Sequence, residues 1–139
     1  MKVSFNYNTK LSLANRTELR AFIKTIIKLE NKKAKSLNFV FCSDKYLLQI
    51  NKAFLNHNYF TDIITFDLSE SKKEITGEIY ISVDRVKDNA RIYKTSIKKE
   101  IHRVMFHGVL HLCGYGDKTK AQKKIMTNRE NHYLAKYFI

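Results

Sequence analysis

The chain has 139 residues, 44% of them hydrophobic, which is enough for a single domain over residues 1–139 and too short for two. No run approaches the roughly eighteen apolar residues that a membrane span needs, and the first residues lead into no signal-peptide core, so we expect a soluble cytoplasmic protein with no membrane partner. The 26 Lys and Arg against 13 Asp and Glu give a net charge of +13, which predicts a polyanionic partner such as nucleic acid, although a Lys-rich solvated surface is the alternative.

The N-terminal part predicts a strand followed by an amphipathic helix. Residues 3–7 alternate apolar and polar side chains, which is the period of a half-buried strand. Asn15 and Glu18 resemble a capping box that starts a helix with one apolar side. That side carries Leu19, Phe22, Ile23, Ile26 and Ile27. The basic side carries Arg16, Arg20, Lys24 and Lys28 at every fourth position, a ridge that either follows RNA phosphates or is simply solvated.

The middle of the chain predicts a strand, a helix and a β-hairpin. Residues 37–42 are rich in β-formers, and a helix follows over 44–54. This helix is expected to bury Leu47, Ile50 and Phe54. A loop over 55–59 leads to strands over 61–67 and 75–82, which a charged turn joins as a hairpin.

The C-terminal part predicts three helices. Ser82 caps a short helix, Thr95 or Ser96 starts a long one, and Thr119 starts the last. A helical connection between neighbouring strands favours parallel pairing, whereas the hairpin adds an antiparallel strand. We therefore predict an α+β fold in which a mixed four-stranded sheet is covered by about five helices.

The end of the long helix carries a candidate metal site. His107 and His111 lie one turn apart on one face of a helix, so both imidazoles can bind one ion, and the apolar residues around them predict a buried central helix. Gly114 and Gly116 end the helix and free the chain, which lets Asp117 fold back towards the histidines. Three protein ligands and an open position are typical of catalytic zinc and indicate a metal-activated hydrolase. The alternative is a pair of core histidines without a metal.

The same segment resembles the signature of a known family. Residues 107–115 read His-Gly-Val-Leu-His-Leu-Cys-Gly-Tyr and are similar to the His-Gly-x-Leu-His-Leu-x-Gly-Tyr motif of the YbeY family of bacterial endoribonucleases. Further matches follow the family's order: Thr61–Phe66, Gly77–Ile79, Met126 and Glu130. The resemblance implies an α+β fold, one Zn²⁺ per chain, no organic cofactor, and cleavage of single-stranded RNA on the ribosome, in 3′-end maturation of small-subunit (16S) ribosomal RNA and in ribosome quality control.

Two positions depart from the family's pattern. Asp117 stands where the family usually has a third histidine ligand. A carboxylate is an accepted zinc ligand, but its charge makes bound water less acidic and widens the choice of metal towards iron or manganese. Leu55 stands where members often have an arginine, six residues before Thr61. A phosphate contact must then come from elsewhere, and His57 and Arg103 are the candidates.

No general base is obvious from the sequence. Gly108 stands where the His-Glu-x-x-His pattern of zinc proteases has its glutamate, which argues against a protease and leaves room for substrate beside the ion. Asp62 and Glu78 are candidates for orienting a ligand or a water molecule, although acidic residues at strand ends are commonly turn or surface residues. The remaining histidines are interpreted as ordinary surface residues: His57, His102 and His132.

Two other functions stay open at this point. The first is a ribosome-associated assembly factor that binds RNA without cutting it and uses zinc mainly as a structural ion. The second is a metallohydrolase of small phosphoesters, which the large positive charge makes less attractive. Cleavage of single-stranded RNA that depends on His111 and on zinc separates the nuclease from both.

Overall fold

The computed structural model describes residues 2–139, which form four strands and five helices in the predicted order. The strands are β1 (Lys2–Tyr7), β2 (Lys33–Cys42), β3 (Ile63–Asp67) and β4 (Glu74–Ser82). The helices are α1 (Arg16–Leu29), α2 (Asp44–Leu55), α3 (Val83–Ile92), α4 (Ile97–Leu112) and α5 (Lys120–Tyr137). The predicted α+β class is confirmed. β2 begins earlier than predicted because its first residues, Lys33 and Ala34, pair with the start of β4.

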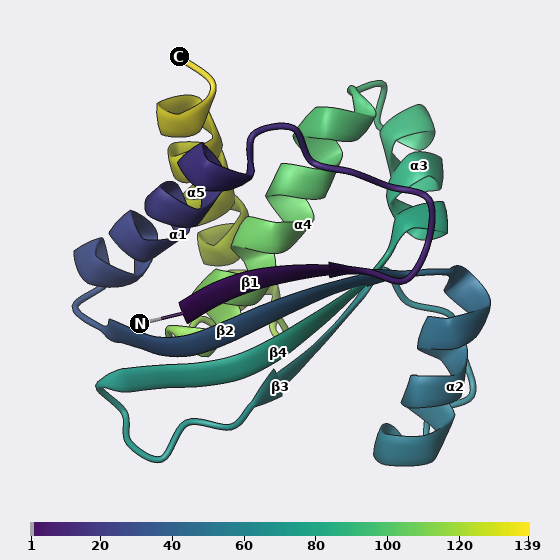
Figure 1. Ribbon diagram of the computed structural model, residues 1–139, viewed down its shortest axis with the longest axis horizontal. Helices are drawn as coiled ribbons and strands as arrows, with labels where there is room; N and C mark the ends of the chain where they lie inside the picture. Colours follow the sequence, from purple (N-terminus) through teal and green to yellow (C-terminus); the bar gives the residue numbers. More distant parts are fainter. Residues whose placement is uncertain (1) are drawn as a thin grey trace.

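The strands form one mixed sheet in the order β1-β2-β4-β3. β1 and β4 run parallel to β2, while β3 pairs antiparallel with β4 as the predicted hairpin. α1 connects β1 with β2, since parallel neighbours need a crossover. β3 and β1 are therefore the two edges of the sheet (Figure 1).

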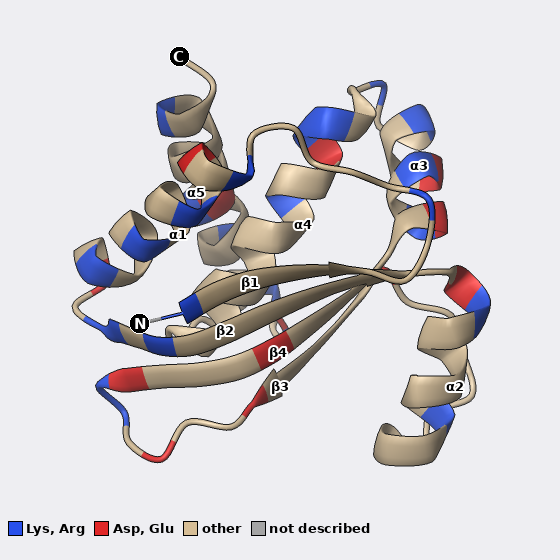
Figure 2. Ribbon diagram, viewed as in Figure 1, with Lys and Arg blue, Asp and Glu red and all other residues tan. Residues whose placement is uncertain are grey.

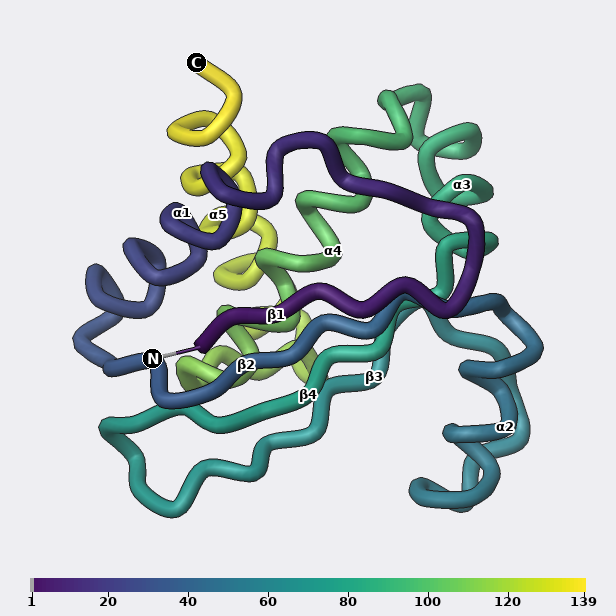
Figure 3. The backbone as a smooth tube through the Cα atoms, in the orientation of Figure 1, coloured from purple at the N-terminus to yellow at the C-terminus, as the bar shows by residue number. Residues whose placement is uncertain are grey.

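Most of the core lies between the sheet and the helices on one of its faces. Alternate residues of the central strands point to this face, because successive side chains of a strand point to opposite sides. The fully buried ones are Leu37, Phe39, Phe41, Ile79 and Ile81. α1 and α4 pack on this face, and α3 and α5 pack against α4 (Figure 1, Figure 3). α4 is thus the buried central helix that the sequence predicts.

His102 on α4 is fully buried, so its interpretation as a surface histidine is wrong. Its ring lies among the aromatic rings of α5 and the C-terminus, because α4 is enclosed by its neighbours. Nδ1 donates to the Lys98 carbonyl at 2.6 Å, and the side-chain amide of Asn15 donates to Nε2 at 3.0 Å. The side chain of Asn15 thus binds His102 and makes no capping hydrogen bond to α1, so the predicted capping box with Glu18 is wrong.

A smaller cluster lies on the opposite face of the sheet, under α2. Its buried members are Cys42, Leu47, Ile50 and Ile64. The prediction that Phe54 joins this core is wrong: its ring meets the ring of Phe66 on the edge strand β3 in a T-shaped contact, and the side chain stays 72% exposed at the end of α2 (Figure 1). The final turn of α2 therefore presents an aromatic ring to solvent.

Charged side chains are unevenly distributed over the fold. Figure 2 shows Lys and Arg along α1 and at the start of β1 and β2, whereas β4 carries acidic residues.

Within the described residues 2–139, no helix is both long and apolar enough to cross a membrane.

Candidate metal centre

The candidate metal centre lies where the last turns of α4 meet the edge strand β3. Gly108 allows the close approach of helix and sheet: a Cβ atom there would lie 2.9 Å from the Ile79 Cδ1 atom and 3.0 Å from the Ile63 Cδ1 atom. Gly108 therefore faces the sheet, and the prediction that it leaves room for substrate is wrong. His107 and His111, on either side of it in sequence, line a cavity above β3.

His107 is held from behind by a buried carboxylate. Its side chain is 19% exposed, and Nδ1 donates to the Glu130 Oε2 atom at 2.6 Å. Nε2 is then directed to the opposite side, where the Asp117 Oδ2 atom lies 3.3 Å away. Burial lowers the pKa of His107, but the hydrogen bond and charge of Glu130, together with the charge of Asp117, outweigh it and raise the pKa.

His111 is supported by the turn that follows α4. Gly114 adopts φ 111°, a conformation that favours glycine, and the chain then turns back as predicted. The Tyr115 carbonyl accepts a hydrogen bond from His111 Nδ1 at 3.1 Å, and the Tyr115 hydroxyl donates to Glu30 at 2.7 Å. Both histidines of the pair thus engage Nδ1, which leaves Nε2 of each as a lone-pair donor for an ion.

The structure brings the three predicted ligands to one cavity. His107, His111 and Asp117 all line a hollow of about 260 Å³. Two imidazole nitrogens and a carboxylate oxygen are a donor set that suits zinc, and histidine ligands commonly donate their second ring nitrogen to a carboxylate or carbonyl group, as these do. Across residues 2–139, no three such side chains yet converge on one point at chelating distance. The side chains of His111 and Asp117 are the exposed members of the predicted set.

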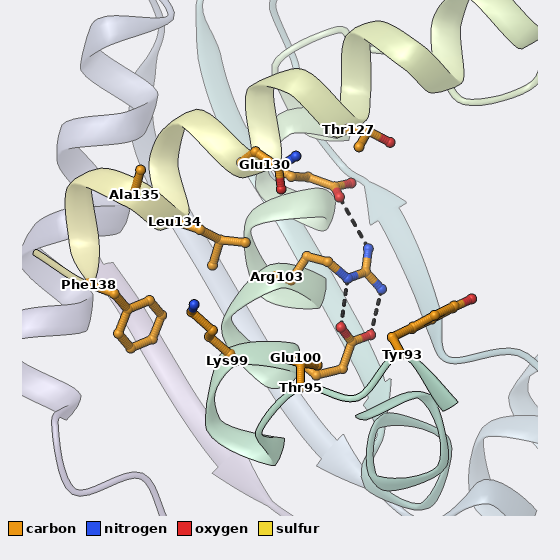
Figure 4. Close-up of a pocket in the computed structure, with 11 residues that line it drawn as sticks. Tyr93, Thr95, Lys99, Glu100, Arg103, Thr127, Glu130, Leu134, Ala135 and Phe138 are labelled. Atoms are coloured by element: carbon orange, nitrogen blue, oxygen red, sulfur yellow. Dashed lines mark hydrogen bonds and ion pairs between the residues drawn. The ribbon is translucent and has the colours of Figure 1, made fainter. Parts of the chain in front are cut away.

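A second layer of charged residues supports His107. Arg103 donates two hydrogen bonds to Glu100, at 2.8 and 2.6 Å, and one to Glu130 at 3.2 Å (Figure 4). Glu100 is 2% exposed, so its charge depends on this partner. The Glu100 hydrogen bonds, against the opposing effect of burial, raise the pKa of Arg103. This network joins α4 to α5 and fixes the predicted ligand His107. Its members are Glu100, Arg103, Glu130 and His107.

The guanidinium of Arg103 is held between carboxylates, and its contact with RNA stays a prediction. It lines a cavity of about 680 Å³ between α4 and α5 (Figure 4). The sequence offered a signal for this role, because Glu100 precedes Arg103 by three residues on a buried helix, where such pairs are neighbours. The partner on α5, Glu130, matched the family pattern but received no role from sequence reasoning.

The two acidic residues that were candidates for orienting a ligand or a water molecule lie in different places. Asp62 accepts a hydrogen bond from Asn89 at 3.2 Å and lies 3.9 Å from Arg103, so it borders the supporting network. Glu78 points to the sheet face opposite α4, where Tyr80 donates to it at 3.4 Å. The structure therefore does not bring Glu78 to the metal cavity.

The loop between α2 and β3 forms another wall of the metal cavity. Leu55, His57 and Tyr59 line it together with the predicted ligands. His57 is exposed, as expected of a surface histidine, but its place in the cavity was not predicted. His132 on α5 is exposed as predicted.

The basic ridge of α1 does not line this cavity. α1 packs over β2 and β1, towards the edge of the sheet opposite β3 (Figure 2). Arg20 donates to the Val3 carbonyl at 2.8 Å, and Lys24 and Lys28 line a separate hollow. Arg16, at the first position of α1, belongs to the same ridge. These four residues are therefore separated from the metal centre.

Comparisons with known proteins agree with this fold. The family model described as Endoribonuclease YbeY matches residues 4–138. The Endoribonuclease YbeY of Cytophaga hutchinsonii is 50% identical over 94% of this chain and 92% of its own length, and that of Flavobacterium psychrophilum is 42% identical over 99% and 97%. A solution structure from Thermotoga maritima is 25% identical, covers 99% of this chain and 89% of its own, and superposes with a TM-score of 0.72. The chain belongs to the YbeY family of endoribonucleases.

Proposed function

We propose that this protein is a zinc-dependent endoribonuclease that hydrolyses phosphodiester bonds of single-stranded RNA. The observation that carries the proposal is the shared cavity of His107, His111 and Asp117, in which both histidines engage Nδ1 and keep Nε2 available. The family match over residues 4–138 and the names of the relatives support RNA as the substrate. The net charge of +13 supports it independently, because a cationic surface attracts a polyanion.

The residues of the chain divide the work in this mechanism. Glu130 orients His107 and favours the tautomer that presents Nε2, and the Tyr115 carbonyl does the same for His111. His107, His111 and Asp117 would hold a zinc ion, which would supply Lewis-acid polarisation of a phosphodiester oxygen and would lower the pKa of a water molecule. The exposed Lys118, which lines the same cavity, is placed to pair with a phosphate of the RNA.

Asp117 gives this centre a different charge from that of a three-histidine site. As a ligand, the carboxylate of Asp117 would cancel one more positive charge of a held ion, so a water molecule there would be less acidic than beside three neutral imidazoles. We therefore propose zinc as the metal, with iron and manganese as the competitors that an Asp-containing set accepts more readily.

The proposed cellular substrate is the 3′ end of small-subunit (16S) ribosomal RNA, in the cytoplasm and on the ribosome. This assignment rests on the resemblance of residues 107–115, 61–66 and 77–79 to the family's motifs, together with the basic charge. Quality control of defective ribosomes is proposed on the same basis.

The test compares wild type and His111→Ala, purified in parallel so that a contaminating nuclease affects both. Each protein is stripped of metal, reloaded with zinc, iron or manganese, and incubated with a single-stranded RNA and with its duplex. We expect zinc-dependent cleavage of the single strand by wild type and loss of cleavage in His111→Ala. Salt-sensitive RNA binding with no cleavage under any metal would instead favour the assembly factor with a structural ion.

A further inference from the structure

The loop that borders the metal cavity presents a stacked pair of rings to solvent. The imidazole of His57 and the phenol of Tyr59 lie with centroids 5.0 Å apart and planes 21° apart. The Tyr59 hydroxyl and His57 Nδ1 are 2.9 Å apart, within hydrogen-bond distance. Tyr59 is nevertheless 56% exposed. An ordered aromatic pair in water next to a candidate active site is a typical recognition surface.

A buried asparagine fixes the loop that carries these rings. Asn51, at 2% exposure, donates its side-chain amide to the Tyr59 carbonyl at 2.9 Å. The main-chain carbonyl of Asn51 accepts a hydrogen bond from the main-chain amide of His57 at 3.1 Å. Asn56 between them adopts φ 56°, a left-handed conformation that asparagine tolerates. The rings are therefore held in place before any ligand arrives, which reduces the entropy lost on binding.

The rings face the same space as the predicted metal ligands. Tyr59 and His57 form one wall of the cavity of about 260 Å³ that His107, His111 and Asp117 also line. A polymer whose phosphodiester lies at the metal centre must pass this wall. Its neighbouring nucleotide therefore lies within reach of the two rings.

We propose that His57 and Tyr59 form a stacking platform for one unpaired nucleobase of the RNA, next to the phosphodiester at the metal centre. The inference rests on the proposed endoribonuclease function and adds the group that selects single strands. Every nucleobase has a π-face that stacks on aromatic side chains, so the platform tolerates any sequence. A base inside a duplex is already stacked and paired and cannot lie on the ring.

The charges around the platform favour RNA over a protein partner. Lys118 is exposed and lines the cavity together with the two rings. Aromatic rings interleaved with cations are typical of grooves that bind single-stranded nucleic acid. The buried centres of protein interfaces are instead depleted of charged residues.

The experiment measures binding in EDTA, so that neither cleavage nor metal loading enters the result. The probe is a short single-stranded RNA with one 2-aminopurine, a base whose fluorescence falls when it stacks. Tyr59→Ala is expected to bind about 5- to 100-fold more weakly and to lose the quenching. Tyr59→Phe keeps the ring and is expected to retain most of both.

Tyr46→Ala is the matched control, because it removes another exposed ring, 39% exposed, from the opposite end of α2. It is expected to leave affinity and quenching unchanged. Equal affinity and quenching in wild type and Tyr59→Ala would overturn the platform. So would a change confined to oligomeric state, which would identify a protein interface. Tyr59-dependent quenching in a protein that cuts no RNA with any metal would support the platform and count against the proposed function alone.

Discussion

The two halves of the metal centre are built differently. The His107 half is buried: its side chain is 19% exposed and Glu130, which holds it, is 5% exposed. The His111–Asp117 half lies on the last turn of α4 and the loop beyond it. There His111 is exposed, and the side chain of Asp117 is 43% exposed. One half is fixed by a charged network, and the other is supported by a single backbone carbonyl.

This contrast separates metal binding from fold stability within one site. The buried half is expected to contribute to both, since the buried Glu130 carboxylate is paired with His107 as well as with Arg103. The exposed half can reorient towards an ion at little cost to the fold. Of the three proposed ligands, His107 is therefore fixed by its buried surroundings, whereas His111 and Asp117 are exposed and free to adjust.

The largest expected effect comes from removing either histidine. His107→Ala and His111→Ala should both lose the metal, falling from one ion per chain to almost none, because too few ligands remain. In the metal-free protein, however, His107→Ala should lower the free energy of unfolding by about 1–3 kcal/mol, since buried Glu130 loses a partner. His111→Ala should change it by less than about 0.5 kcal/mol. Elemental analysis and urea denaturation measure the two effects; equal destabilisation by both variants would break the comparison.

A change behind the ligand should weaken the centre without removing it. Glu130→Gln keeps an oxygen that accepts from His107 but removes the charge that orients it and pairs with Arg103. We expect metal affinity to fall about 10- to 100-fold, the usual effect of changing such a partner. Competition with a zinc-sensitive dye measures the affinity, and Glu70→Gln, in the exposed hairpin turn, is the control. An unchanged affinity would show that Glu130 is not needed for orientation.

Asp117→His tests whether the exposed half supplies a charged ligand to the metal. Histidine is also a zinc ligand, so we expect metal affinity within about tenfold of wild type. Removal of the carboxylate charge should make the activated water more acidic, which moves the alkaline rise of the cleavage rate to lower pH. Rates measured between pH 6 and 9 on one RNA decide this, and a shift to higher pH would contradict the assignment of Asp117 as a ligand.

The smallest expected effect is a pair of opposite pH dependences on α4. Burial lowers the pKa of His102, so its contribution to stability is present above the unfolded pKa of about 6.5 and is lost as pH falls towards the folded value. The raised pKa of His107 in the metal-free protein has the opposite sign: its contribution is full below about 6.5 and is lost as pH rises through the folded value.

Urea denaturation of the metal-free protein from pH 5 to 8 measures both contributions. His102→Gln should flatten the loss of stability in acid, whereas His107→Gln should cost most stability in acid and least at pH 8. Each unit by which the folded and unfolded pKa values differ corresponds to about 1.4 kcal/mol. Parallel curves for the two variants would show that the two histidines do not differ in this way.

The fold could be predicted because its signals are local. Ser82 and Ser96 each cap their helix through a neighbouring amide, and Thr119 forms a complete capping box. Strand alternation and helix periodicity also act over a few residues. Phe54 shows the limit, because its spacing fits a core face, but its ring meets only the edge of the sheet at Phe66 and stays 72% exposed.

The supporting parts of the site depend on contacts between distant segments. Arg103 meets Glu130 across 27 positions, and Asn15 meets His102 across 87. Neither pairing has a local pattern, since it depends on how α4 packs against α1 and α5. The position of His57 beside the predicted ligands could not be predicted for the same reason.

The close contact at Gly108 has a consequence for the chemistry. Because this position points into the sheet, against Ile79 and Ile63, a carboxylate introduced there would enter the apolar core and not the cavity. Helix α4, which carries the two proposed ligands His107 and His111, therefore cannot also supply a proton acceptor at position 108. Any proton acceptor has to come from solvent or from another segment of the chain. Substitutions in that segment can then alter proton transfer without disturbing the proposed ligands on α4.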